Sequence, residues 1–262
     1  MAANPELLSW LRAACAEYRF DVAALYQRHG DHAWPLEAAD FDDLSRQLDA
    51  GGHFLPLPKE PAALANVLEV SIVRFLVERA ADHEDVDVEI GTERGYPDLE
   101  FSGRAFGGGF HAVDLKAARR KPLKRSPPRQ TQSRITLYTG NTYFAWPDLQ
   151  WPGMLRPFAE YESHVDVIAI YTLDTDATER ATEIEVIVQE PWRIASKERS
   201  STTREYIGAV LELERLREGA GDFDSEEDFY KYWRAFDFRM PKALRAQLSK
   251  LISQQKEAGD RD

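Results

Sequence analysis

The stretch GYPDLEFSGRAFGGGFHAVDLK, residues 95–116, joins two short apolar runs through a glycine-rich turn, with Asp98, Asp114 and Lys116 in or beside those runs. Acidic residues are depleted in strands, and a buried carboxylate without a partner is costly. Alternation along the second run places Asp114 and Lys116 on one face, and hairpin pairing would bring Asp98 alongside. The pattern therefore predicts a site in which something offsets the charge of clustered acids.

Regular elements are predicted on both sides of this hairpin. Helices are predicted over residues 5–19, over 62–80 and from about Ser225, and strands over 86–90, 97–101, 109–115, 165–173 and 183–189. The stretch 117–134, which contains three prolines, is predicted to be a basic loop. Strands with helices before and after them indicate one domain of the α/β (α+β) class, with a mixed β-sheet flanked by helices.

The composition is that of a globular protein, with 43% apolar and 30% charged residues. No run approaches the roughly 20 apolar residues that span a bilayer, and the N-terminal MAANPELLSWLRAA lacks the layout of a signal peptide. The single cysteine, Cys15, excludes an internal disulfide and fits a reducing cytoplasm, where we expect this protein. We interpret it as a buried structural thiol. The six histidines show no spacing typical of a zinc site.

Charge is distributed unevenly along this acidic chain, whose net charge is -12. Residues 111–156 hold nine Lys or Arg against two acids, and residues 193–204 hold four cations against one glutamate. A local basic surface can bind phosphates even on an acidic protein, because the electrostatic field of nearby charges dominates at contact distance while distant charges are screened. Two solvated loops would show the same pattern, so charge alone leaves both readings open.

The chemistry of the hairpin is that of a divalent metal site. Two carboxylates with free coordination positions suit Mg²⁺, and an adjacent lysine can orient a water or stabilise charge on a phosphate. Of the nine lysines, Lys116 alone has an acid two positions earlier. The alternative is an exposed acid and lysine on an edge strand. Glu69, inside the apolar ANVLEVSIVRF, either lies on a polar stripe beside Arg74 or Arg94 or reaches the same site.

Several stretches together resemble the PD-(D/E)xK nucleases, and among them the EcoRV family of type II restriction endonucleases. GYPDLEF and AVDLK are similar to the metal-binding strands, and VLEV carries a glutamate at the family's distance upstream. VQEPWRIA and SSTTREYIG resemble the strand and recognition loop, and GDFDSEEDFYKYWR resembles a late helix. The similarity covers most of residues 60–236 and implies a restriction-endonuclease-like core.

The resemblance implies roles for the hairpin residues. Asp98 and Asp114 would bind Mg²⁺, the Leu115 carbonyl would complete the metal shell, and Glu69 would be an auxiliary acid. Lys116 would position or deprotonate the attacking water. The residues that the resemblance and the charge pattern place against DNA are Ser200, Ser201, Thr202, Thr203, Arg204, Arg94, Arg119, Arg120, Thr136 and Thr142. The loop SSTTR departs from the family's glycine- and asparagine-containing loop, so the family's target sequence is not carried over.

The function that the resemblance implies is that of a homodimeric, Mg²⁺-dependent, sequence-specific endonuclease of double-stranded, palindromic DNA that leaves 5′-phosphates. Residues 1–60 are expected to supply dimerisation elements, 62–190 the catalytic core and 191–240 the recognition loop and following helices, and 253–262 to be a frayed tail. A DNA methyltransferase is expected in the host, but not as a stable partner. No association with a membrane is expected. The alternatives are a structure-specific or repair nuclease of the same fold, an inactive DNA-binding homologue, and a protein-binding module.

Overall fold

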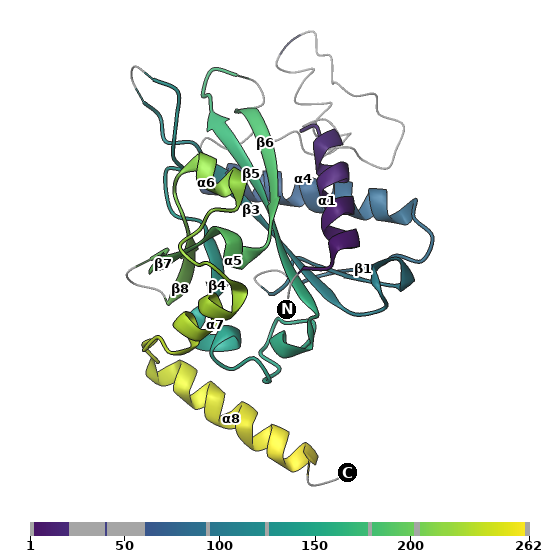
Figure 1. The fold of residues 1–262 in the computed structure, drawn as a ribbon, viewed down its shortest axis with the longest axis vertical. Helices are drawn as coiled ribbons and strands as arrows, with labels where there is room; N and C mark the ends of the chain where they lie inside the picture. Colours follow the sequence, from purple (N-terminus) through teal and green to yellow (C-terminus); the bar gives the residue numbers. More distant parts are fainter. Residues whose placement is uncertain are drawn as a thin grey trace.

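A five-stranded sheet forms the centre of the computed structural model, which describes residues 3–20, 40, 61–92, 95–123, 126–177, 180–201 and 205–259 (Figure 1). Its order is β1-β2-β3-β5-β6, and the strands are β1 (Asp87–Ile90), β2 (Leu99–Ser102), β3 (His111–Arg119), β5 (Ser163–Leu173) and β6 (Ala181–Gln189). Strands β3 and β5 are parallel, and the other neighbours are antiparallel. The predicted class, α/β (α+β) with a mixed sheet flanked by helices, is confirmed.

The strand that carries Asp114 is longer than predicted. It continues to Arg119, because its parallel pairing with β5 extends to the pair Arg119 and Tyr171. The basic loop predicted over residues 117–134 is therefore wrong at its start, where residues 117–119 belong to β3. Sequence alternation ended the strand early because Ala117 and Ala118 carry no signal for either face.

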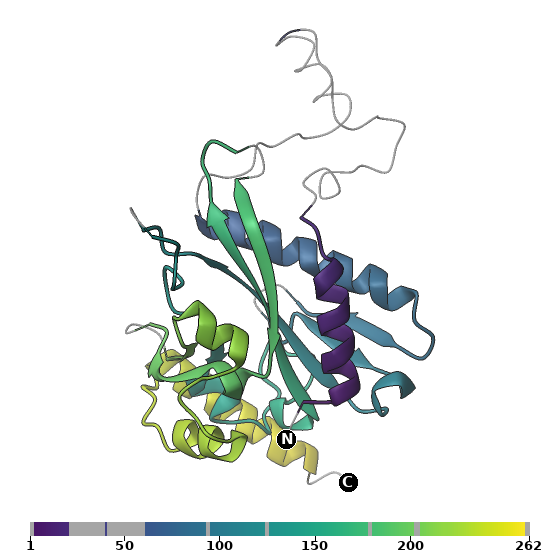
Figure 2. The ribbon, with the colours of Figure 1, turned by 45° about the horizontal axis from the view of Figure 1, so that its top comes forward.

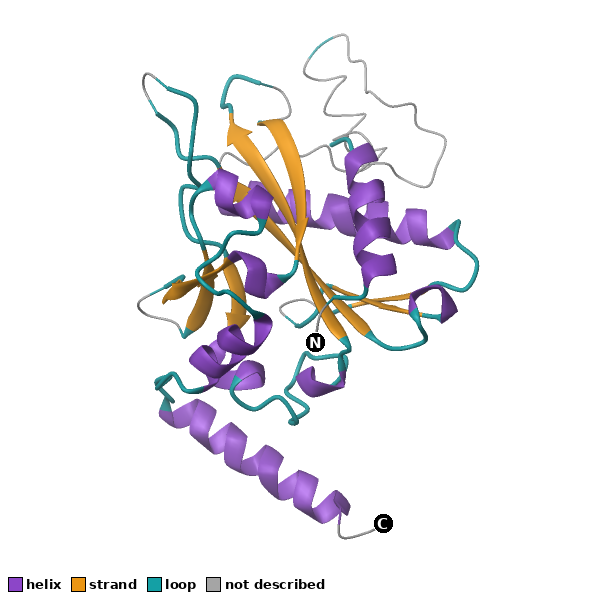
Figure 3. Ribbon diagram, in the orientation of Figure 1, coloured by secondary structure: helices purple, strands orange, loops and turns teal. Residues whose placement is uncertain are grey.

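A second, three-stranded sheet was not predicted (Figure 3). Its order is β4-β8-β7, and its strands are β4 (Thr136–Thr139), β7 (Ala195–Arg199) and β8 (Tyr206–Ala209). The strands have four or five residues each, and the pairing is irregular between β4 and β8 and between β7 and β8. Such short segments give almost no periodicity for a sequence-based prediction.

Helices lie on both sides of the large sheet. They are α1 (Pro5–Glu17), α4 (Pro61–Ala81), α5 (Pro191–Ile194), α6 (Leu213–Glu218), α7 (Glu226–Arg234) and α8 (Lys242–Gly259), with short 3₁₀ turns at Arg104–Phe106 and Phe158–Glu160 and a π turn at Gly140–Phe144. The predicted start of α7 near Ser225 is confirmed, since Ser225 caps the helix and its hydroxyl accepts a 3.1 Å hydrogen bond from the Asp228 N–H. Helix α8 runs through Gly259, so the frayed tail stays a prediction.

The two faces of the large sheet are packed against different layers. In β3 and β5, odd-numbered residues such as Val113, Leu115 and Val167 face α1 and α4, whereas even-numbered residues such as Ile168 and Ile170 face the small sheet and α7. Both ribbon views show α6, α7 and the small sheet on one side of the long strands and α1 on the other (Figures 1 and 2). Asp114 and Lys116, also even-numbered, therefore face the small sheet.

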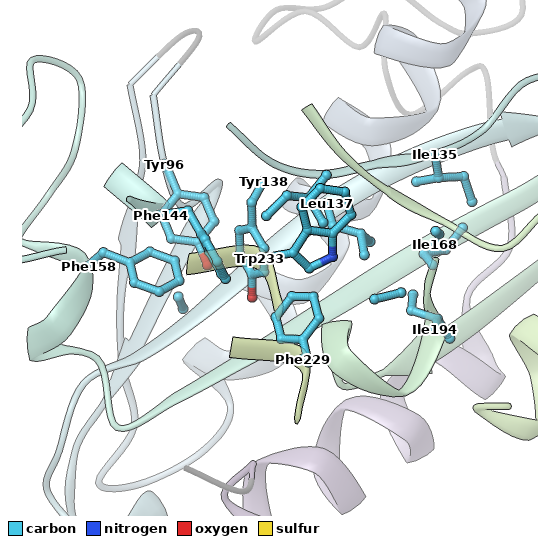
Figure 4. Close-up of a cluster of buried hydrophobic side chains, with 14 of the residues drawn as sticks. Tyr96, Ile135, Leu137, Tyr138, Phe144, Phe158, Ile168, Ile194, Phe229 and Trp233 are labelled. Atoms are coloured by element: carbon cyan, nitrogen blue, oxygen red, sulfur yellow. The ribbon is translucent and has the colours of Figure 1, made fainter. Parts of the chain in front are cut away.

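The layer between the two sheets is strongly aromatic. Tyr138, Phe144, Phe229 and Trp233 are all buried there, and Figure 4 shows them gathered with Tyr96 and Phe158. The rings pack mainly edge to face or offset, with centroids 5.3–6.3 Å apart among Tyr138, Phe144 and Phe229. This core fixes the position of the small sheet relative to the strand that carries Asp114.

Burial accounts for the expected structural role of Cys15. Cys15 is a free, buried thiol of α1, and burial raises the pKa of this thiol to about 12, as expected of a structural cysteine.

None of the helices in the described parts of the chain combines the length and the apolar character that crossing a membrane requires.

An ion pair with a buried carboxylate holds Arg156, in the segment after the π turn, against β2, and breaking it should be strongly destabilising. The Arg156 guanidinium donates two hydrogen bonds of 2.6 Å to Glu100, whose side chain is 4% exposed, and lies 3.3 Å from the ring centre of Phe110. We expect Arg156→Ala to lower the free energy of unfolding by about 3–5 kcal/mol, because Glu100 is left charged and unpaired. Chemical denaturation measures this loss.

The control for this prediction is Arg104→Ala. Arg104 pairs with Asp85 at 2.5 Å, but its side chain is 85% exposed, so we expect a loss below about 1 kcal/mol. Equal losses in the two variants would contradict the assignment of the Arg156 pair as structural.

Candidate active site

The site lies where β3 loses its neighbour on one side. Strand β2 pairs with β3 only through His111, Ala112 and Val113. Beyond that point the Leu115 N–H donates a 2.6 Å hydrogen bond to the Asp98 carboxylate, and the Ala117 N–H donates one of 2.8 Å to Glu69. Two acidic side chains thus take the place of a missing strand, and this explains why carboxylates are accommodated here.

The structure brings Lys116 into the middle of the predicted set. Its ammonium contacts the Asp114 carboxylate, donates a 3.1 Å hydrogen bond to the Leu115 carbonyl and lies 3.9 Å from Asp98 Oδ2. The exposed fractions of the side chains are 38% for Asp98, 24% for Lys116 and 8% for Asp114. The cluster therefore opens to solvent on the Asp98 side, while Asp114 lies inside. The catalytic roles of these residues stay predictions.

The electrostatics of the cluster favour a further positive charge. Burial raises the pKa of Asp114 well above its usual range, and Lys116 opposes this shift, whereas Asp98 and Asp166 add to it. Burial raises the pKa of Glu69 too, against the effect of Lys116. Burial lowers the pKa of Lys116, but Asp114 and Asp98 outweigh it and raise the pKa overall, so the ammonium stays charged.

The donor set fits a divalent metal ion. A cation, the Lys116 ammonium, already lies against two of the three predicted ligands, Asp114 and the Leu115 carbonyl, and near the third, Asp98. All three are hard oxygen donors, which Mg²⁺ prefers while retaining several waters. Within the described ranges no three His, Cys, Asp or Glu side chains form a metal-binding group. A metal here would therefore be held by two carboxylates, a carbonyl and water.

One acidic residue of the site was missed by the sequence analysis. Asp166 of β5 is the register partner of Asp114, is 1% exposed, and has no hydrogen-bond partner at Oδ2. Burial raises its pKa to about 7, against the opposing effect of Lys116. The sequence does contain a signal for this residue, since Asp166 is the one acid within the apolar run VDVIAIYTL. The sequence does not reveal the strand register that places Asp166 beside Asp114.

A histidine packs in the aromatic layer near this site. The Tyr96 hydroxyl and His164 Nδ1 share a 2.6 Å hydrogen bond, and the imidazole stacks on Phe158 with ring centres 4.1 Å apart. Burial, with a smaller effect of His111, lowers the pKa of His164 from 6.5 to about 3. The imidazole is therefore neutral in the folded protein across the physiological range.

This shift predicts a pH dependence of stability. Between pH 6.5 and 3 the unfolded chain binds a proton at His164 that the folded protein does not, so stability falls as the pH falls. Relative to His164→Phe, the wild-type protein should lose up to about 1.4 kcal/mol of unfolding free energy per pH unit below pH 6. Denaturation curves of the two proteins from pH 7 to 4 measure this difference. Parallel pH profiles would contradict a neutral, buried His164.

Four of the ten residues predicted to contact DNA have hydrogen-bond partners within the protein. Thr136 of β4 and Ser200, just after β7, share a 2.9 Å hydrogen bond between their hydroxyls, so the structure joins these two segments. Arg120 has protein partners, with a 3.2 Å hydrogen bond to Glu185 and another to the Glu183 carbonyl. Thr142 donates a 3.3 Å hydrogen bond to the Thr139 carbonyl.

The structure gives less information on the other six residues predicted to contact DNA. Arg119, at the end of β3, has a buried Nε without a hydrogen-bond partner, and Ser201 is the second of the two described residues of the predicted recognition loop 200–204. Thr202, Thr203, Arg204 and Arg94 lie outside the described residues. DNA contact by all ten residues stays a prediction.

A mixed sheet with a Pro-Asp before one strand and Asp-x-Lys on the next is the arrangement of a PD-(D/E)xK nuclease. Residues 31–256 match the model of the family described as restriction endonuclease EcoRV. The chain belongs to the EcoRV restriction endonuclease family, and is thus a nuclease of the restriction-enzyme type. No individual curated protein matches the chain.

Proposed function

We propose that the protein is a Mg²⁺-dependent, sequence-specific endonuclease of double-stranded DNA that acts as a type II restriction enzyme and leaves 5′-phosphates. One observation carries the proposal: Asp98, Asp114, Lys116 and the Leu115 carbonyl converge at the open edge of β3. Membership of the EcoRV family supports DNA as the substrate.

The protein's own groups divide the work of phosphodiester hydrolysis. A bound divalent cation supplies Lewis-acid chemistry and lowers the pKa of a water. Asp98 and Asp114 would hold it, with the Leu115 carbonyl, and Glu69 adds negative charge from beneath through its contact with Ala117. Lys116, partly exposed at the opening, can orient the attacking water and stabilise the charge that develops on the phosphate.

The small sheet supports the DNA-reading part of the proposal. Ser200, the first residue of the predicted recognition loop 200–204, shares a hydrogen bond with Thr136 of this sheet. A two-fold homodimer would present two sites to a palindrome, one for each strand. Of the segment 1–60 proposed for dimerisation, α1 packs against its own sheet, and residues 21–39 and 41–60 lie outside the described residues.

Digestion of a large, methylation-free DNA tests the proposed function. Purified protein with Mg²⁺ should give discrete fragments whose sequenced ends share one motif and carry 5′-phosphates. Cutting confined to nicks or junctions would favour the structure-specific or repair nuclease instead. Salt-dependent binding without cutting would indicate an inactive homologue, and no binding at all a protein-binding module.

A further inference from the structure

Asp166 adds a third aspartate to the row that crosses the large sheet. In the strand order β2-β3-β5, Asp98 precedes β2, Asp114 lies on β3 and Asp166 on β5, so Asp114 lies between the other two. Register partners on adjacent parallel strands project to the same face and are separated by about 4.8 Å. The carboxylates of Asp114 and Asp166 are therefore neighbours on the face that also carries Lys116.

The carboxylate of Asp166 is only partly compensated by the described residues, since Lys116 opposes the effect of its burial without pairing with it. The residue is 1% exposed, and its Oδ2 has no hydrogen-bond partner. The ammonium of Lys116 lies against Asp114 and near Asp98, and no ion pair involving Asp166 occurs among the described residues. A buried acid without a partner is unfavourable, so a group that the chain does not supply should satisfy it.

We propose that Asp166 is an additional ligand of the metal centre, which binds a hard divalent cation such as Mg²⁺ or Mn²⁺ together with Asp114. This inference rests on the metal dependence of the proposed function. Asp114 has two oxygens, and with Asp98 on one side and Asp166 on the other it can serve a cation on each. Asp98 is the exposed end of the row and Asp166 the buried end.

Mn²⁺ binding to the full chain without DNA, followed by electron paramagnetic resonance, tests the assignment. Asp166→Asn keeps the side-chain shape, and Asp166→Leu replaces the acid with an apolar group of the same branching but larger volume. We expect both variants to bind Mn²⁺ at least tenfold more weakly than the wild type, or to bind one ion fewer. The control Asp87→Asn removes the same charge from an exposed residue of β1 and should leave binding unchanged.

Stability measurements separate a metal ligand from a structural acid. The thermal midpoints of both Asp166 variants without metal should equal or exceed that of the wild type, because an uncompensated buried acid is removed. The rise in midpoint that Mn²⁺ causes in the wild type should shrink in both. Should Asp166→Leu fail to fold, the isosteric Asp166→Asn decides.

Mn²⁺ affinity and stoichiometry within twofold of the wild type in a folded Asp166 variant would overturn the inference. That result leaves the proposed function intact when the wild type cuts DNA with Mg²⁺. Conversely, loss of Mn²⁺ binding in Asp166→Asn supports the inference even if the wild type cuts no DNA, in which case the proposed function fails alone.

Discussion

Asp114→Ala is expected to reduce the rate of Mg²⁺-dependent DNA cleavage by at least about 10³-fold. Asp114 is the buried centre of the cluster, where it contacts the Lys116 ammonium and lies between Asp98 and Asp166. Its removal would take away a proposed metal ligand and the carboxylate that contacts the Lys116 ammonium. Single-turnover cleavage of a plasmid that carries the recognised sequence measures the loss.

DNA binding should survive the same change. Binding measured in Ca²⁺ is expected to stay within a few-fold of the wild type, because phosphate contacts by basic residues supply most of the affinity. The matched control is Asp148→Ala, which alters the second Pro-Asp pair, Pro147-Asp148, at an exposed position. Full cleavage by Asp114→Ala, or an equal loss in Asp148→Ala, would rule out the assigned site.

Lys116→Ala is expected to slow cleavage by about 10²–10⁴-fold, the usual contribution of a positioned proton-transfer or charge-stabilising group. Removing the Asp114 carboxylate should weaken the binding of a divalent cation, whereas removing the Lys116 ammonium should not. The ammonium lies against the oxygen donors that a metal would use, so its removal leaves them free for a divalent cation. We therefore expect Mn²⁺ affinity to be equal to or higher than that of the wild type.

A matched lysine distinguishes this role from a general effect of charge. Lys121 is exposed and lies just beyond the end of β3, so Lys121→Ala should retain cleavage within a few-fold. Loss of Mn²⁺ binding in Lys116→Ala would show that the lysine supports the metal site instead of acting beside it. Wild-type cleavage by Lys116→Ala would remove it from the mechanism.

The hairpin formed by β2 and β3 was the most predictable part of the candidate site. Asp98, Asp114 and Lys116 lie within 19 residues of one another, so period-two alternation and one turn suffice to bring them together. Glu69 was placed only by resemblance, because its contact with the Ala117 N–H depends on how α4 packs across the sheet. This contact joins residues that are 48 positions apart, and a local sequence pattern does not predict contacts over that separation.

The parts that sequence reasoning missed depend on pairing between distant strands. Asp166 became part of the site through the parallel register of β3 and β5, which no pattern within either strand specifies. The same pairing extends β3 to Arg119. The small sheet joins segments from residue 136 to residue 209, and its strands are too short to show an alternation of their own.

The metal centre is the claim on which the rest depends, and anomalous diffraction tests it most directly. Crystals of the full chain with a duplex that carries the recognised sequence and with Mn²⁺, collected at the manganese edge, would locate the ion. We expect an anomalous peak within coordination distance of the Asp98 and Asp114 carboxylates and the Leu115 carbonyl. A peak elsewhere, or none at that edge of β3 in the presence of bound DNA, would contradict it.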